Sequence, residues 1–234
     1  MILKANLIAN RLTSQEPEEL ADPLFITPFP NLEELKRSGS ASVDLRLGTW
    51  FSTLRQTRVP VLEVDDELTH AAQKAGITPE QLRIFQELLP TSEVPSEANL
   101  TKSQYVPFGS RFILHPQSFV LGVTLEWVRL PSNLAGYVVG RSSWGRRGLI
   151  IATAAGVHPG FTGCLTLELT NVGEIPIVIK PGMTICQLFL HMVDSKSPET
   201  DKSPFACSRR PSLGKIKLDE VAEKLSRARS ERRS

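Results

Sequence analysis

Short runs of apolar and β-branched residues, separated by Pro, Gly and Asn, dominate the chain from residue 105 to residue 191. Runs this short and this closely spaced are typical of the strands of an all-β sandwich or barrel. Strands do not alternate with helices here, which argues against a parallel doubly wound sheet. The predicted strands cover residues 112–114, 119–125, 134–139, 149–152, 164–169, 175–179 and 184–190.

The N-terminal part of the chain predicts short helices before the first strand. Residues 2–12 have the spacing of a short amphipathic helix. A second helix is expected over 31–38, because Asn31 is a good N-cap and Gly39 a good stop. In residues 41–47 apolar and polar positions alternate with a period of two, which indicates a half-buried strand.

Two further segments differ from the β region in their pattern of apolar and polar residues. Residues 65–99 have helical spacing and end in a polar stretch, so we expect a helical insertion between strands. Residues 194–214 are polar and rich in Pro and Ser, which favours a flexible arm, and 218–229 could form a terminal helix. The predicted organisation is a mainly β domain over 1–193, followed by an arm and basic tail over 194–234.

Composition and charge narrow the class of protein. The 234 residues carry 27 Lys and Arg against 25 Asp and Glu, and this balance makes nucleic acid an unlikely partner. Residues 201–234 hold ten basic and five acidic side chains, a charge run of the kind that is usually solvated. No stretch approaches the ~18 apolar residues of a membrane span, and the first residues do not resemble a signal peptide.

Cysteine and histidine usage bears on compartment and on metal chemistry. Cys164, Cys186 and Cys207 form no C-x-x-C pair, so we expect neither a disulfide framework nor a structural zinc site. A reducing cytoplasm is the expected location. The four histidines occur in no H-E-x-x-H or H-x-E pattern, and the sequence therefore offers no zinc hydrolase ligand set.

Residues 140–148, which we call the arginine–serine segment, are the densest candidate for chemistry. Their glycines and small hydroxyl side chains would let backbone N–H groups approach an anion, and their arginines would supply charge. A triphosphate is a plausible ligand of this segment. The alternative is a solvated basic turn between two strands.

Glu168 lies on a predicted strand in which Cys164, Thr166, Glu168 and Thr170 would share one face. That face could simply be exposed to solvent, since charged side chains on strands are usually solvated. If it lines a cleft beside the arginine–serine segment, Glu168 is the natural general acid and base. His158 falls in a turn-like stretch, and Asp44 reads more readily as a packing partner than as a catalyst.

Several motifs together resemble the dCTP deaminase branch of the dUTPase-like superfamily. They occur between about residue 40 and residue 191, in that family's order and close to its spacing. The motifs are Ala-Ser-Val-Asp-Leu-Arg-Leu-Gly at 41–48, Leu-His-Pro at 114–116, Val-Thr-Leu-Glu at 123–126, Gly-Arg-Ser-Ser-x-x-Arg-x-Gly at 140–148, Pro-Gly-Phe-Thr-Gly-Cys-Leu-Thr-Leu-Glu at 159–168 and Lys-Pro-Gly-Met at 180–183.

The resemblance implies a distorted β-barrel that forms homotrimers, with active sites between subunits. It implies hydrolysis of dCTP to dUTP and ammonia, with Mg²⁺ accompanying the triphosphate and no zinc. Carried over by position, Glu168 is the catalytic glutamate, and Ser142 and Arg146 act close to the reacting base. The nucleotide-binding positions are Arg141, Ser142, Ser143, Arg146, Ala154, His158 and Thr166, and Arg209 and Arg210 of the arm are added as lid residues that meet the triphosphate.

The chain also departs from the family pattern. His158 stands where the family usually has Asp, and Ala155-Gly156 stand where the deaminases often have His-Arg. The arm lacks the family's typical Tyr-containing pattern. Two other functions therefore remain open: a dUTPase or bifunctional enzyme that yields dUMP, and a nucleotide-binding paralogue without catalysis.

Overall fold

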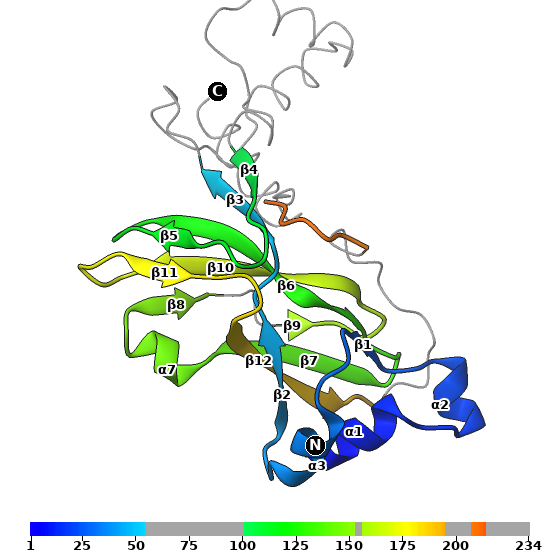
Figure 1. The fold of residues 1–234 in the computed structure, drawn as a ribbon. Coiled ribbons are helices and arrows are strands. Elements are labelled where there is room, and N and C mark those ends of the chain that lie inside the picture. The colour runs from blue at the N-terminus through cyan, green and yellow to red at the C-terminus, as the bar shows by residue number, and fades with distance from the viewer. Residues whose placement is uncertain (55–100, 153–155, 195–206, 214–234) are drawn as a thin grey trace, which may run out of the picture. The chain divides into compact units, whose positions relative to one another are not determined.

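The computed structural model describes residues 1–54, 101–152, 156–194 and 207–213, which belong to one compact unit (Figure 1). The elements in chain order are α1 (Ala5–Leu12), α2 (Pro17–Ala21), β1 (Phe25–Thr27), α3 (Leu32–Arg37), β2 (Ser42–Arg46), β3 (Trp50–Leu54), β4 (Thr101–Tyr105), β5 (Phe112–Leu114), β6 (Phe119–Arg129), β7 (Leu134–Gly140), α7 (Ser142–Gly145), β8 (Leu149–Ile151), β9 (Gly156–Val157), β10 (Thr162–Asn171), β11 (Ile177–Ile179) and β12 (Thr184–Met192). The mainly β fold is as predicted.

The strands form three sheets. One follows the order β4-β3-β6-β10-β8, with β1 also paired to β6. A second follows β2-β12-β7-β9, and β11 pairs with β5 in a third. The paired strands run antiparallel throughout the described residues. Strands far apart in sequence therefore lie side by side, as β2 and β12 do.

A single hydrophobic core joins the two larger sheets. Leu167 and Leu169 of β10 and Leu188 and Leu190 of β12 belong to the same buried cluster. Alternate residues of β10 from Leu165 onward are buried, which matches the period of two expected for a strand with one face on a core. The partly exposed residues between them form the other face, and Glu168 is one of these.

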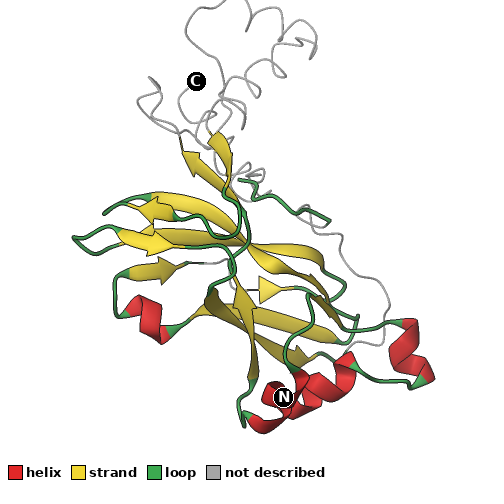
Figure 2. Cartoon of the chain, viewed as in Figure 1, coloured by secondary structure: helices red, strands yellow, loops and turns green. Residues whose placement is uncertain are grey.

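Helices α1 and α3 lie side by side near β2 of the four-stranded sheet, whereas α7 lies apart from them, next to β8 (Figure 2). The predicted helix at 31–38 is confirmed, because the Asn31 side chain accepts a hydrogen bond from the Glu34 N–H at the start of α3. The first helix begins at Ala5 rather than at residue 2. Ile2 instead forms a bridge with His191, and the Leu3 N–H donates to the Leu190 carbonyl at 2.9 Å.

Three predictions fall wholly or mostly outside the described residues: the helical insertion over 65–99, the terminal helix over 218–229, and most of the arm. The part of the arm that is described, residues 207–213, packs against its own chain. The Cys207 N–H donates to the Thr162 carbonyl at 2.6 Å, and the Ser208 carbonyl accepts from the Cys164 N–H at 3.0 Å. Gly163 allows this approach, since a Cβ there would lie 3.2 Å from the Cys207 nitrogen and the φ of Gly163 is +150°.

Candidate active site

The arginine–serine segment contains a short helical turn, α7, which the sequence analysis did not predict. Arg141 is the N-cap of α7 in an extended conformation, and Arg146 follows the helix as its C-cap. The N–H groups of Ser142 and Ser143 stand at the start of α7, where the helix itself supplies no acceptor. Ser142, Ser143 and Arg146 are all exposed, so the segment presents hydroxyl groups, N–H donors and a guanidinium to its surroundings.

Gly148 ends this turn and only glycine fits there. Its φ is +90°, and a Cβ would lie 2.9 Å from the Gly173 nitrogen. The Gly148 carbonyl then accepts a hydrogen bond from the Val172 N–H at 2.9 Å. The glycine therefore attaches the end of the arginine–serine segment to the residue that follows β10.

Arg141 is tied to the four-stranded sheet. Its guanidinium forms an ion pair with the Asp44 carboxylate on β2, and its backbone N–H donates to the Ile185 carbonyl at 3.1 Å. The other Asp44 oxygen accepts from the Gln187 side-chain amide on β12 at 3.0 Å. Asp44 thus binds two neighbouring side chains, those of Arg141 and Gln187. One of them, Arg141, is a candidate nucleotide-binding residue.

Glu168 lies in the middle of β10, in the six-stranded sheet. It pairs with Leu121 of β6, and its backbone carbonyl accepts from the Ala152 N–H at 2.9 Å. Within the described ranges, the Glu168 carboxylate makes no hydrogen bond or ion pair with another side chain. Within one chain, no hydrogen bond or ion pair among the described residues links Glu168 to Arg141. The Arg141 side chain pairs instead with Asp44 of the four-stranded sheet.

Thr166 lies next to a β-bulge in β10, where the register with β6 shifts between Cys164 and Thr166. This bulge was not visible in the sequence. It interrupts the alternation, and Cys164 is buried rather than sharing the partly exposed face with Thr166 and Glu168. His158 is exposed just after β9, and Ala154 lies outside the described residues.

Arg209 and Arg210 of the arm lie over two tryptophan rings of the six-stranded sheet. The Arg209 guanidinium is 5.2 Å from the centroid of Trp127, and that of Arg210 is 4.1 Å from the centroid of Trp50. Cation–π contacts of this kind are favourable at protein surfaces. In the described structure both arginines therefore contact their own chain, and their role at a triphosphate stays a prediction.

The structure also shows a buried carboxylate that sequence reasoning did not single out. Glu126 on β6 is 2% exposed and accepts from Arg46 twice. The Arg46 N–H donates to one carboxylate oxygen at 2.7 Å, and its Nε–H donates to the other at 2.6 Å. The two residues are 80 positions apart, so no local pattern in the sequence could reveal this pair.

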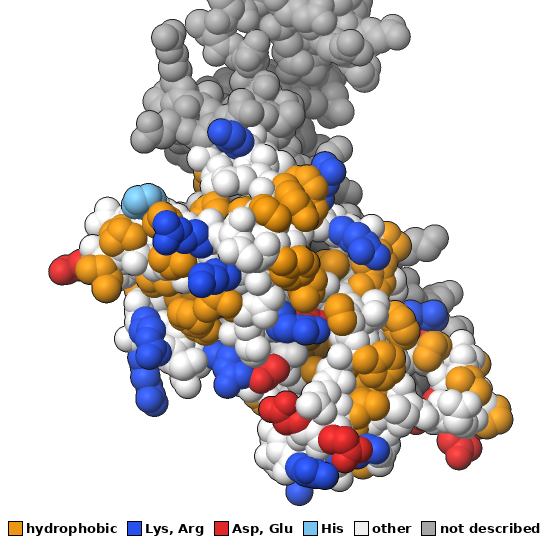
Figure 3. All heavy atoms as spheres, viewed as in Figure 1, with side chains coloured by type: hydrophobic (Ala, Val, Ile, Leu, Met, Phe, Trp, Pro, Cys, Tyr) orange, Lys and Arg blue, Asp and Glu red, His pale blue; other side chains and the backbone are white. Residues whose placement is uncertain are grey.

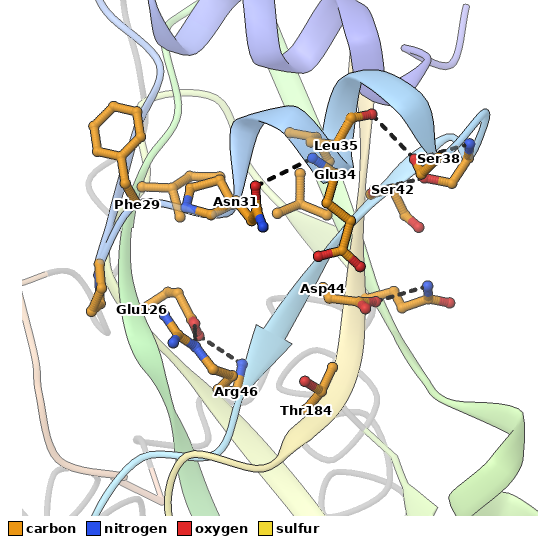
Figure 4. Close-up of a pocket in the computed structure, with 16 residues that line it drawn as sticks. Phe29, Asn31, Glu34, Leu35, Ser38, Ser42, Asp44, Arg46, Glu126 and Thr184 are labelled. Carbon is orange, nitrogen blue, oxygen red and sulfur yellow. Dashed lines mark hydrogen bonds and ion pairs between the residues drawn. The ribbon is translucent and has the colours of Figure 1, made fainter.

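A pocket of about 340 Å³ opens beside this pair, between α3, β2 and the loop after β1 (Figure 4). The carboxylates of Glu34 and Asp44 and the Arg46–Glu126 pair lie around it, and Gln187 completes one side. Neither Glu168 nor the arginine–serine segment lines this pocket. Because its lining is rich in carboxylates, it would repel a triphosphate and does not suit the nucleotide by itself.

Among the described residues, no group of three or more His, Cys, Asp or Glu side chains is arranged to hold a metal ion. No helix there is both long enough and apolar enough to cross a bilayer.

Comparison with known proteins gives the class. The model of the dCTP deaminase-like family matches residues 11–193. The chain is 31% identical over 202 residues to "dCTP deaminase, dUMP-forming" of Methanobrevibacter smithii, which covers 84% of this chain and 89% of the relative. It is 38% identical over 187 residues to the dCTP deaminase of Halorubrum lacusprofundi, covering 80% of this chain and 76% of the relative.

A solved structure shares the fold. The 2'-deoxycytidine 5'-triphosphate deaminase of Agrobacterium tumefaciens superposes with a TM-score of 0.52 at 18% identity. The match covers 82% of this chain. It covers 48% of the Agrobacterium tumefaciens chain, so this chain spans about half of that chain's length. The protein described here belongs to the dCTP deaminase-like family.

Proposed function

We propose that this protein hydrolyses dCTP to dUTP and ammonia, with Glu168 as the general acid and base. The observation that carries the proposal is the presence of two features on a fold that matches the family. One is the arginine–serine segment with its serines and Arg146 exposed, and the other is a mid-strand carboxylate without a side-chain partner among the described residues. Family membership supplies the substrate class.

The chemistry asks for one group that can move protons. Water attacks C4 of the cytosine ring and must lose a proton, while N3 and the departing amine must gain protons. A single carboxylate beside C4 can take the first proton and deliver it in turn, so that dCTP and water give dUTP and ammonia. Ser142 and Arg146 would hold and polarise the water and the base, and Thr166 would contact the pyrimidine through its backbone.

The phosphates need cationic and N–H donors. Arg141, Ser143 and the N–H groups at the start of α7 supply them in our proposal. Mg²⁺ bound with the triphosphate would be held mainly by phosphate oxygens and water. When bound, the ion would neutralise phosphate charge.

A homotrimer is part of the proposal, because within one chain the Arg141 side chain pairs with Asp44 of the four-stranded sheet, whereas Glu168 lies on the six-stranded sheet. A three-fold ring would place the arginine–serine segment of one subunit beside the Glu168 strand of the next. Exposed apolar side chains are available for such an interface, and one face of the unit shows them between Lys and Arg side chains (Figure 3). Among the described residues, the exposed apolar side chains include Tyr105, Phe108, Ile113, Phe119 and Val178.

Light scattering tests the assembly, and truncation tests the arm. We expect a mass near three chains for the whole protein. Truncation after His191 should keep that mass and remove most turnover, because Arg209 and Arg210 would no longer be available to the triphosphate. A monodisperse monomer with full activity would contradict the shared site, and a trimer indifferent to truncation would contradict only the role of the arm.

The bifunctional reaction that continues to dUMP is the second candidate. It is favoured by the name of the Methanobrevibacter smithii relative, "dCTP deaminase, dUMP-forming". One experiment separates the candidates: product analysis after incubation with dCTP, and separately with dUTP, in the presence of Mg²⁺. Ammonia and dUTP support deamination alone, while dUMP and pyrophosphate from dCTP support the bifunctional enzyme. The absence of any product would support a silent nucleotide-binding protein.

A further inference from the structure

Helix α7 reaches the hydrophobic core through one side chain, Trp144. Its four residues are Ser142, Ser143, Trp144 and Gly145, of which only Trp144 is partly buried. The Trp144 ring packs against the core cluster. A helix this short cannot hold its own shape, since forming a single turn is unfavourable without outside contacts. The orientation of α7 must therefore come from its attachments.

The indole of Trp144 is attached at a β-bulge in β12. Against β2, the register of β12 shifts between Thr184 and Cys186, and the ladder of β12 with β7 begins only at Cys186. Bulges leave backbone groups unpaired within the sheet and redirect them. Here the Thr184 carbonyl accepts from the Trp144 Nε1–H at 3.0 Å. The next carbonyl, that of Ile185, accepts from the Arg141 N–H.

The two ends of the arginine–serine segment have attachments of their own. Arg141 holds the beginning through Asp44 and Ile185, and Gly148 holds the end through Val172. Both attachments lie outside the four residues of α7. Among the described residues, Trp144 is the one side chain of α7 that hydrogen-bonds to another element, and in sequence it lies between the exposed Ser142 and Arg146.

We propose that Trp144 is a positioning residue of the nucleotide site. Its indole N–H, bound to the Thr184 carbonyl at the β12 bulge, fixes the rotation of α7 and so the places of Ser142 and Arg146. The proposal rests on the function proposed above for this segment. A displacement of about 1 Å in a positioned group can cost up to ~10²-fold in rate, so a single anchoring hydrogen bond can matter to turnover.

The test removes the donor and keeps the ring. Trp144→Phe should lower kcat/KM for dCTP by about fivefold to tenfold, the effect of one lost hydrogen bond. Replacing Trp144 by benzothienylalanine keeps the size of the indole and deletes only its N–H, so it should give the same loss even if Trp144→Phe folds poorly. Tyr137→Phe, on β7, is the matched control, because it removes one polar atom from an aromatic side chain outside α7; its kinetics should not change.

A double-mutant cycle separates positioning from a general loss of stability. If Trp144 acts through Arg146 and Ser142, Trp144→Phe should cause a smaller loss of kcat/KM in the Arg146→Ala background than in the wild type, because only the placement of Ser142 is then left to lose. Multiplied losses in the double variant, or wild-type kcat/KM in the benzothienylalanine variant, would overturn the proposal.

The product analysis of the wild-type protein tests the proposed function before any Trp144 variant is measured. If dUTP proves to be the substrate, the same cycle is run on pyrophosphate release. If nothing is turned over, it is run on the Kd for dCTP measured by calorimetry, where an unchanged Kd in the benzothienylalanine variant overturns the role of Trp144.

Discussion

Strands β6 and β10 are neighbours in one sheet and each carries a single glutamate, yet the two carboxylates have opposite surroundings. Glu126 on β6 is buried, and Arg46 donates to both of its oxygens. Glu168 on β10 is partly exposed, and among the described residues no side chain bonds to it. A buried carboxylate persists only with full hydrogen bonding. The contrast suggests a division of roles: the satisfied glutamate belongs to the fold, while the one without a side-chain partner among the described residues is the one to which our proposal gives the proton transfers.

Glu168→Gln should break this comparison most strongly. An amide cannot accept the proton of water, so we expect deamination to fall by ~10² or more, with the melting temperature nearly unchanged. Ammonia release and calorimetric binding of dCTP are the measurements, and binding should largely survive. Glu174→Gln, an exposed carboxylate after β10, is the matched control. Near-wild-type ammonia release by Glu168→Gln would remove this residue from the mechanism.

Glu126→Gln should show the reverse pattern. Glutamine keeps one acceptor oxygen and puts an NH2 donor in place of the other, so one donation from Arg46 is lost and the remaining one goes to a neutral acceptor; we expect the free energy of unfolding to fall by about 2 kcal/mol. Because the Arg46 side chain is 37% exposed, water can take over part of its solvation, which keeps the loss from being larger. Urea unfolding measures the change, with Glu34→Gln on the exposed surface of α3 as control. Turnover per folded molecule should remain; unchanged stability would show that the pair contributes nothing.

Two arginines sharpen the comparison, since one has a carboxylate partner and the other has none among the described residues. Arg141 is paired with Asp44, whereas Arg146 makes no ion pair in the described part of the chain. We expect Arg146→Ala to lower kcat about tenfold and Arg141→Ala mainly to raise KM, because an interaction made only in the transition state affects turnover. Steady-state kinetics on dCTP separate the two. If both variants changed only KM, the assignment of Arg146 to the reacting base would be wrong.

Asp22 provides the smallest effect. Partial burial raises its pKa, but the N–H of Ser132 and the guanidinium of Arg129 donate to the carboxylate and bring the pKa below its ordinary value of 3.8. A lowered folded-state pKa means that the ionised group stabilises the fold above pH 3.8, and this contribution is lost as the pH falls through the folded pKa. Asp22→Asn should therefore cost less than ~1 kcal/mol at pH 7, and the cost should be smaller near pH 2 than at pH 7. Equal losses in melting temperature at both pH values would contradict this account.

Local patterns predicted the central strands and the α3 cap well. The N-cap at Asn31 and the alternation in residues 165–171 depend only on neighbours a few positions away, and both appear as expected. Strands β3 and β4 were not predicted. Of the five residues of β4, only Thr101 is buried, so polar and apolar positions do not alternate there as they do in a half-buried strand.

What escaped prediction depends on contacts distant in sequence. The bulges in β10 and β12 are set by the partner strands, and the pairing of Arg46 with Glu126 joins positions 80 residues apart. The docking of Arg209 and Arg210 on Trp127 and Trp50 is of the same kind. For the candidate site, the motif order supplied the residues that we propose, and the structure shows which of them are tied to Asp44 or to Thr184.

The placement of the three cysteines makes the arm accessible to selective chemical labelling. Burial raises the pKa of the Cys164 thiol and raises that of Cys186 to about 12, so neither offers much reactive thiolate at neutral pH. Cys207 is exposed and stands beside Ser208 at the point where the arm meets Gly163. A maleimide dye added to the unmodified protein would thus attach at one position. Its emission would report in real time whether the arm stays on its own sheet when nucleotide is added, without a single substitution.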